Sequence, residues 1–151
     1  MCSSDLGSTI PLYFYARLQF FDNNTDDLIF NIWGSDIYYW VYDPTFLTRA
    51  VKLSSLAGAV AVPQQVNLTM FASSGHYVAL GCTNYDATAS APDYLGTYDP
   101  LLIRWANVDP DVGPQPQVWQ PTLTNTAGFL RLQSGSRIVA VQNSQIGRAH
   151  V

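Results

Sequence analysis

Histidine and cysteine are the residue types in this chain most often used for acid–base or nucleophilic chemistry. His76 lies at a turn just before an apolar run, and Cys82 ends that run. Catalysis would require His76 to face an acid and a hydroxyl or thiol. Because of their positions, we interpret His76 as a structural or solvent-facing polar group and Cys82 as a small buried side chain. The sequence therefore predicts no catalytic residue and no cofactor.

Two groups of aspartates could in principle act together. Asp26 and Asp27 form one candidate set with Asp36, because a hairpin would bring Asp27 toward Asp36, as paired carboxylates require. Aspartates at strand ends more often accept hydrogen bonds from turn backbone, which is the reading we favour. Asp109 and Asp111, followed by Gly113, have oxygen ligands at alternating positions that would suit Ca²⁺. The spacing and the final Glu of a calcium-binding loop are absent, so we expect a surface loop and no metal site.

An aromatic set offers a third kind of chemistry, the stacking of a sugar ring. It consists of Tyr38, Tyr39, Trp40, Trp105 and Trp119. Their positions within expected strands favour packing between sheets. Tyr39, Trp105 and Trp119 are nevertheless the candidate contacts for a ligand or partner.

The composition indicates which elements hold these residues. The chain has 13% aromatic residues, no Glu and a single Lys, Lys52, and its formal net charge is −4. Strands favour aromatic and β-branched residues, whereas helices favour Glu, Lys, Ala and Leu. We therefore expect an all-β fold. No Lys/Arg cluster indicates nucleic-acid binding, and no apolar run approaches the roughly 20 residues of a membrane helix.

Short apolar runs separated by Gly, Pro, Asn, Asp and Ser predict the strands. They are 12–21, 27–32, 37–42, 50–53, 66–72, 77–82, 101–106, 129–133 and 138–142. Gly34 with Ser35, and the 73–75 segment, predict hairpin turns. A helix is the alternative over 49–62, but Gly58 and Pro63 favour a strand followed by a loop there.

Three apolar segments, 27–31, 77–81 and 137–141, resemble one another. Continuous apolar runs of this length indicate strands buried on both faces. Their spacing of about 50 and 60 residues suits blade-like repeats. We therefore predict an incomplete β-propeller-like fragment of antiparallel blades, in which these segments are the innermost strands. A β-sandwich is the alternative.

The two ends of the chain are related through DNA. Residues 1–6 can be encoded by GTG TGC TCT TCC GAT CT, with GTG as an initiator codon read as Met. The reverse complement of this DNA encodes Ile-Gly-Arg-Ala-His, the sequence of residues 146–150. This DNA resembles a sequencing adapter. We expect residues 1–6 and 146–151 to be adapter-derived, and residues 7–145 to be a fragment of a β-repeat structural domain.

A longer resemblance covers nearly all of 20–142. The ordered pieces DPLLIRWAN (99–107), VWQPTLTNTAG (118–128), LRL (130–132) and SGSRIV (134–139) resemble a family of structural proteins from tailed-bacteriophage virions. Segments 27–29, 37–40, 49–50, 53–59 and 76–82 are also similar to it. Asn107 replaces an acid-containing motif of the family, and loop 108–117 is longer and Pro-rich.

The resemblance implies a non-enzymatic component of the tail or nozzle, located in the virion. Its partners would be other virion proteins and further copies in a symmetric homo-oligomer. Two rival hypotheses are a carbohydrate-binding β-module that uses surface Trp and Tyr side chains, and a fragment of a propeller hydrolase whose acids lie elsewhere.

Overall fold

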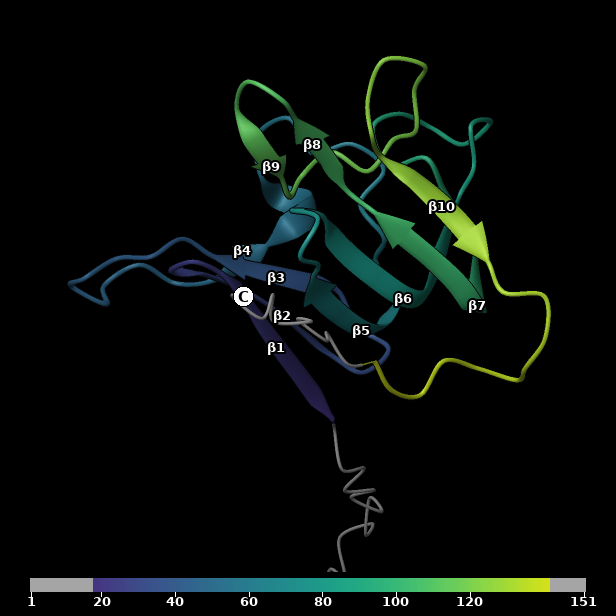
Figure 1. The fold of residues 1–151 in the computed structure, drawn as a ribbon, viewed down its shortest axis with the longest axis horizontal. Helices are drawn as coiled ribbons and strands as arrows, with labels where there is room; N and C mark the ends of the chain where they lie inside the picture. The colour runs from purple at the N-terminus through teal and green to yellow at the C-terminus, as the bar shows by residue number, and fades with distance from the viewer. Residues whose placement is uncertain (1–17, 142–151) are drawn as a thin grey trace, which may run out of the picture.

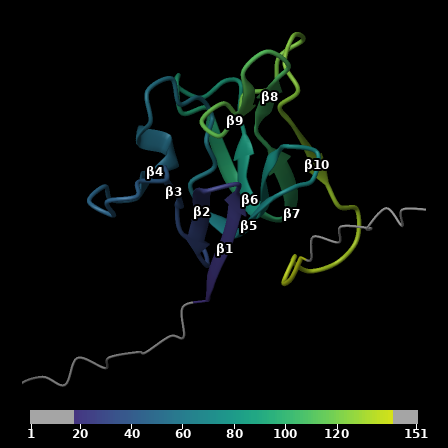
Figure 2. The same ribbon diagram turned by 60° about the vertical axis from the view of Figure 1, so that its left-hand side comes forward.

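The structure, a computed structural model, describes residues 18–141 as two four-stranded antiparallel sheets and one small hairpin (Figures 1 and 2). The expected adapter-derived ends lie outside these residues. The first sheet has the order β1 (Gln19–Asn24), β2 (Asp27–Ile32), β3 (Ile37–Trp40), β4 (Val51–Lys52). The second has the order β10 (Gly128–Arg131), β7 (Leu95–Trp105), β6 (Tyr77–Tyr85), β5 (Val66–Phe71). The hairpin pairs β8 (Asn107–Asp109) with β9 (Gly113–Gln115), and Leu53–Ser55 forms the 3₁₀ turn η1.

Tight turns fold each sheet back on itself. Gly34 adopts a φ of 72° between β2 and β3, and Gly75 adopts a φ of 87° between β5 and β6. Glycine takes such positive φ angles without steric penalty, which confirms the two predicted hairpins.

The two sheets meet where the inner face of the first sheet covers strand β5, the edge of the second. An uncovered edge would leave backbone groups without partners. The Asn31 carboxamide instead donates to the carbonyls of Val66 and Asn67 at 2.9 and 3.0 Å, and accepts the Thr69 hydroxyl at 3.0 Å. Further along β5, the Asp22 carboxylate accepts the Phe71 amide at 2.7 Å. Side chains of one sheet therefore complete the hydrogen bonding of the other.

Apolar residues close the space on both sides of the second sheet. The larger core joins Ile29, Ile37 and Tyr39 of the first sheet to Tyr77, Ala79, Cys82 and Leu102 of the second. A smaller core on the opposite face joins Leu68 and Leu80 to Ile138, with Phe20 and Trp33 packed against it.

The strand predictions agree well with the structure, with clear exceptions. Strand β2 was predicted to the residue, while β7 is longer than expected and begins at Leu95. Most of the Pro-rich segment predicted as loop 108–117 belongs to the unpredicted hairpin β8–β9, which begins at Asn107. The strand predicted at 138–142 is wrong over 138–141, where the structure has no strand, and residue 142 lies outside the described part. Over 49–62, where a helix was the alternative to a strand and loop, the structure has strand β4 followed by the 3₁₀ turn η1.

The predicted all-β, antiparallel class is confirmed. The prediction that 27–31 and 77–81 are innermost strands is wrong, because β2 and β6 each have a neighbouring strand on both sides. An innermost strand of a propeller blade would be an edge strand. Strand β2 also lacks the expected burial on both faces, since its residues alternate between buried and partly exposed.

Candidate functional site

The two candidates for nucleophilic or acid–base chemistry have structural environments. His76 is half-buried, and its Nδ1 lies 2.8 Å from the carbonyl oxygen of Ala106. Cys82 is a free thiol with no exposed surface. Burial raises the pKa of this thiol to about 12, so the reactive thiolate form is disfavoured. Both residues therefore occupy the structural positions expected for them.

The aspartates serve turns and ion pairs instead of forming a catalytic pair. Asp27 lies at the start of β2, whereas Asp36 lies in the turn at the opposite end of that strand. Asp27 accepts hydrogen bonds from the Tyr39 hydroxyl and the Tyr42 amide, at 2.5 and 2.8 Å. Asp36 pairs with Lys52 at 2.8 Å. The hairpin that was considered as a way to join the two carboxylates separates them.

Asp109 organises the turn of the β8–β9 hairpin. Its Oδ1 accepts the amides of Asp111 and Val112 at 2.8 and 3.2 Å. This is the turn-stabilising geometry typical of aspartate. Within residues 18–141 no group of three or more His, Cys, Asp or Glu side chains is placed to hold a metal ion.

The three candidate contact residues are not brought together. Trp119 is fully buried, so its indole is a core element and presents no surface to a ligand. Tyr39 is 8% exposed, and burial together with the Asp27 hydrogen bond raises the pKa of its hydroxyl. Trp105 is half-buried, donates Nε1–H to the Thr126 carbonyl at 2.8 Å, and lies against Gly128. Their contacts fasten strands and loops.

Arg104 is a central residue that the sequence analysis did not single out. It is fully buried, and its guanidinium donates to the carbonyls of Thr83, Ala61 and Trp119 at 3.0, 2.6 and 3.1 Å. Burial lowers the pKa of this guanidinium to about 10. Arg104 thereby ties two loops to the second sheet. A charged residue inside the apolar run Leu101–Trp105 was the available signal.

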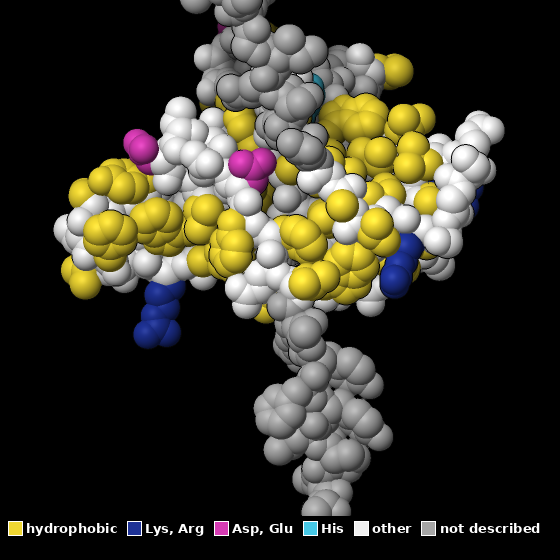
Figure 3. Space-filling model, turned by 60° about the horizontal axis from the view of Figure 1, so that its bottom comes forward, with side chains coloured by type: hydrophobic (Ala, Val, Ile, Leu, Met, Phe, Trp, Pro, Cys, Tyr) yellow, Lys and Arg dark blue, Asp and Glu magenta, His cyan; other side chains and the backbone are white. Residues whose placement is uncertain are grey.

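An aromatic ladder runs across the outer face of the first sheet. Phe21, Phe30 and Tyr38 are cross-strand partners, with ring centroids 5.6 and 5.4 Å apart in successive stacked pairs. Leu28 and Trp40 form the neighbouring cross-strand pair on the same face. Hydrophobic side chains cover much of the surface in Figure 3, which turns the β1 side of the molecule forward. We call Phe21, Leu28, Phe30, Tyr38, Trp40 and the adjoining Phe46 the outer face.

The loop between β3 and β4 extends this face and projects from the sheets in Figure 1. Phe46 at its tip is 74% exposed and stacks on Trp40, with the ring centroids 6.0 Å apart and the planes inclined by 7°. Asp43 holds the loop by accepting the amides of Thr45, Leu47 and Thr48 and the Thr45 hydroxyl. The hydrogen bonds from Thr45 and Thr48 hold the pKa of Asp43 well below its usual range.

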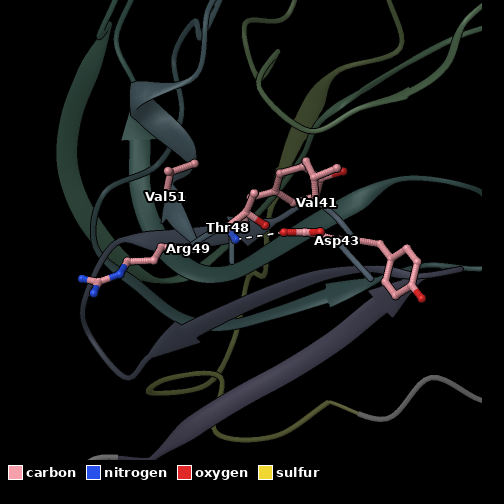
Figure 4. A pocket seen from close by; sticks show the side chains of 7 residues that line it. Val41, Asp43, Thr48, Arg49 and Val51 are labelled. Carbon is pink, nitrogen blue, oxygen red and sulfur yellow. Dashed lines mark hydrogen bonds between the residues drawn. The ribbon is translucent and has the colours of Figure 1, made fainter. Parts of the chain in front are cut away.

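A shallow, mainly apolar hollow of about 260 Å³ lies beneath this loop. Figure 4 shows the Asp43 carboxylate directed toward Thr48, whereas the Arg49 guanidinium points away. The two charges therefore do not converge on a ligand. The hollow includes Tyr39 among its lining residues but neither Trp105 nor Trp119.

Comparisons with known proteins do not test the resemblance to tailed-bacteriophage virion proteins, which stays a prediction. No family model, no curated protein and no solved structure matches the chain. In the part of the chain that the structure describes, no helix is long and apolar enough to cross a membrane.

Proposed function

We propose that this chain is a non-enzymatic structural component of a bacteriophage virion, a tail or nozzle scaffold acting through protein–protein contacts. Its partners are other virion proteins and further copies of itself in a symmetric assembly. The outer face is the observation that carries this proposal. The virion assignment itself rests on the sequence resemblance.

The chemistry of the outer face suits a protein partner. Phe21 and Phe46 are 58% and 74% exposed, and the less exposed Phe30, Tyr38 and Trp40 lie between them. A contiguous apolar patch of this kind is unusual on a monomer and typical of an interface. Buried aromatic side chains also dominate the binding energy of protein interfaces.

The fixed loop lowers the cost of association. Its tip residue Phe46 is already stacked on Trp40, and Asp43 binds the loop backbone at several points. A side chain ordered before binding loses less conformational entropy when a partner covers it. The loop therefore presents a pre-formed apolar anchor beside the aromatic ladder.

The proposal that the chain consists of propeller-like repeats is supported only by the order of strands within each sheet. Both four-stranded sheets run in an antiparallel order that follows the chain, as propeller blades do, although β8–β9 is inserted in the second. The first sheet, however, covers the edge of β5, whereas blades stack face to face. We retain a repeated four-stranded unit as the proposal, with the β-sandwich as its alternative. A continuation of the reading frame into another apolar strand–turn–strand unit is expected, and a helical, Lys- and Glu-rich continuation would contradict the repeat.

Analytical ultracentrifugation tests the interface. We expect the chain to associate as its concentration rises, and a Phe21→Ser/Phe46→Ser double variant to associate at least tenfold more weakly. Leu123→Ser is the matched control, because Leu123 is fully exposed in a loop outside the outer face. A wild type that stays monomeric, or equal weakening by the control, would refute the interface.

The virion assignment has a separate test in the neighbouring DNA. We expect the genes that flank this coding sequence to encode phage head or tail proteins. Flanking genes of cellular metabolism would contradict the assignment while leaving the interface result intact.

A further inference from the structure

A second hollow lies where the β2–β3 turn meets the second sheet. It has a volume of about 280 Å³ and is lined by Trp33, Gly34, Gln65, Asn67 and Tyr98. This volume is near the lower end of the ~300–1,000 Å³ range of ligand pockets, which suits a small molecule or one unit of a polymer.

The walls of this hollow are fixed by backbone contacts. Gly34 donates its amide to the Val66 carbonyl at 2.8 Å, and the Val66 amide donates to the Ser35 carbonyl at 3.0 Å. Gln65 is held by its amide, which donates to the Thr83 hydroxyl at 3.0 Å. The turn, the start of β5 and strand β6 therefore form one frame around the hollow.

Asn67 gives the hollow an unusual polar group. Its side chain is 1% exposed, and its Oδ1 accepts the Tyr98 hydroxyl at 3.0 Å. Its Nδ2 has no hydrogen-bond partner within residues 18–141. A buried donor without a partner costs about 1–3 kcal/mol, so the other orientation of the carboxamide, which pairs this donor, is favoured once Tyr98 directs its hydroxyl proton elsewhere.

Gly81 makes room for this amide. Its φ of 59° lies at a bulge in β6, and a Cβ at this position would stand 2.6 Å from Asn67 Nδ2. Only glycine leaves space for the carboxamide here. The bulge therefore keeps Asn67 beside Tyr98.

The Asn67–Tyr98 pair can direct a proton toward a ligand. If the carboxamide turned over, Nδ2 would donate to the Tyr98 hydroxyl oxygen, and the buried donor would gain its missing partner. Tyr98 would then be free to donate its own O–H to an oxygen of a bound molecule. Tyr98 is 40% exposed, so its hydroxyphenyl ring is accessible.

The remaining lining groups define the chemistry of the ligand. The Gln65 carboxamide is exposed and forms no hydrogen bond with the described residues, so it can both donate and accept. The Trp33 ring packs against Phe20, with 6.1 Å between ring centroids, and the Arg137 guanidinium lies 6.0 Å from its ring centre. The lining therefore combines aromatic rings with neutral amides and a hydroxyl, and it includes no charged side chain.

We propose that this hollow binds one neutral pyranose ring of a glycan. Aromatic side chains would contact the C–H face of the sugar, while Tyr98 and Gln65 would hydrogen-bond its hydroxyl groups. This site uses Trp33 and Tyr98, and none of the aromatic residues expected from the sequence. The inference does not depend on the scaffold function, because the hollow lies apart from the outer face.

NMR titration with methyl glycosides of glucose, galactose, mannose and N-acetylglucosamine tests the proposal, with N-acetylneuraminic acid as a charged comparison. We expect at least one neutral glycoside to cause saturable shifts in the Trp33 indole and Asn67 side-chain amide signals. Tyr98→Phe, which removes one hydroxyl, should weaken that binding at least tenfold. Gln65→Ala should weaken it severalfold, and because Gln65 is exposed, this variant should leave the fold intact.

The matched control is Tyr42→Phe, because Tyr42 is similarly exposed but lies at the β3–β4 loop. It should bind the glycoside as the wild type does. Absence of saturable shifts with every neutral glycoside would overturn the proposal, as would equal effects of Tyr98→Phe and Tyr42→Phe. Preferential binding of N-acetylneuraminic acid would overturn the assignment to a neutral sugar.

Discussion

The two sheets differ in how much of their apolar surface is covered by the rest of the chain. The second sheet has cores on both faces, one shared with Ile29 and Ile37 of the first sheet and one closed by Ile138. The first sheet covers its inner face with the edge of the second and leaves an aromatic outer face exposed. Strands β5 and β6 of the second sheet are therefore largely buried within the chain, although Phe129 and Leu130 on its edge strand β10 are 48% and 56% exposed. The first sheet leaves a contiguous aromatic face available for another molecule.

Polar residues show the same division. Arg104 and Asn31 are buried, and their hydrogen bonds go to backbone carbonyls of separate segments. The outer face instead has its polar groups at the margin, where Lys52 pairs with Asp36. Buried polar groups thus fix the internal arrangement of the sheets, while the residues that define the outer face include no charged side chain.

The largest effect is expected from Arg104→Ala, which removes a buried guanidinium from the second sheet. It leaves a cavity and three carbonyls without their donor, and we expect a loss of about 3–5 kcal/mol in the free energy of unfolding. Arg131→Ala is the control, because Arg131 forms an exposed ion pair with Asp99 that should contribute about 0–1 kcal/mol. Urea denaturation measures both, and equal losses would show that Arg104 does not tie the loops to the sheet.

Asn31→Leu tests the junction between the two sheets. The leucine would bury a similar volume but leave the Val66 and Asn67 carbonyls without the donor they now have. We expect a loss of about 2–4 kcal/mol in the free energy of unfolding. Gln19→Leu, at an exposed position of β1, should change it by no more than about 0.5 kcal/mol. A small effect at Asn31 would mean that apolar packing and the Asp22–Phe71 hydrogen bond hold the sheets together without it.

These residues also mark how far the sequence could predict the structure. Apolar runs and turn residues predicted β2 and the Gly34 and Gly75 hairpins, because these features depend on neighbours in sequence. Strand β7 extends through Pro100, and β9 contains Pro114. Because proline usually disfavours strands, the sequence analysis missed β9 and the first part of β7. The apolar run at 138–141 does not form a strand, although Ile138 is buried.

The candidate sites were harder to predict than the strands. Trp119 was kept as a possible ligand contact, although packing between sheets was favoured for its aromatic set, and it lies in the core through contacts with distant segments. The pairing of Asn67 with Tyr98 joins residues 31 positions apart. A usable signal was present in the polar residues Asn31 and Arg104, each inside an otherwise apolar strand, since such residues require buried partners.

A pair of neighbouring residues on β2 separates the two faces directly. Ile29 is fully buried on the inner face, so Ile29→Ala should lower the free energy of unfolding by about 3 kcal/mol. Phe30 lies between Phe21 and Tyr38 on the outer face, so Phe30→Ala should lower it by only about 1 kcal/mol and should weaken self-association. Denaturation and sedimentation of the two variants give the comparison. If Ile29→Ala folded but no longer associated, while Phe30→Ala still associated, the outer face would not be the interface.

The smallest expected effect concerns the loop that extends the outer face. The carboxylates of Asp43 and Asp86 both accept the backbone amide and hydroxyl of the threonine two residues later, and these bonds lower the pKa of each carboxyl. Asp43 also accepts amides from Leu47 and Thr48.

A carboxyl with a lowered pKa contributes order above the ordinary aspartate pKa of about 3.9, and this order is lost as the pH falls through its folded pKa. NMR titration should therefore show the Asp86 loop changing at a higher pH than the Asp43 loop. Thr45→Val should raise the Asp43 midpoint, and Thr88→Val should raise only that of Asp86. If both loops changed together, the extra amide contacts would not hold Phe46 in place, and the outer face would lose its pre-ordered anchor.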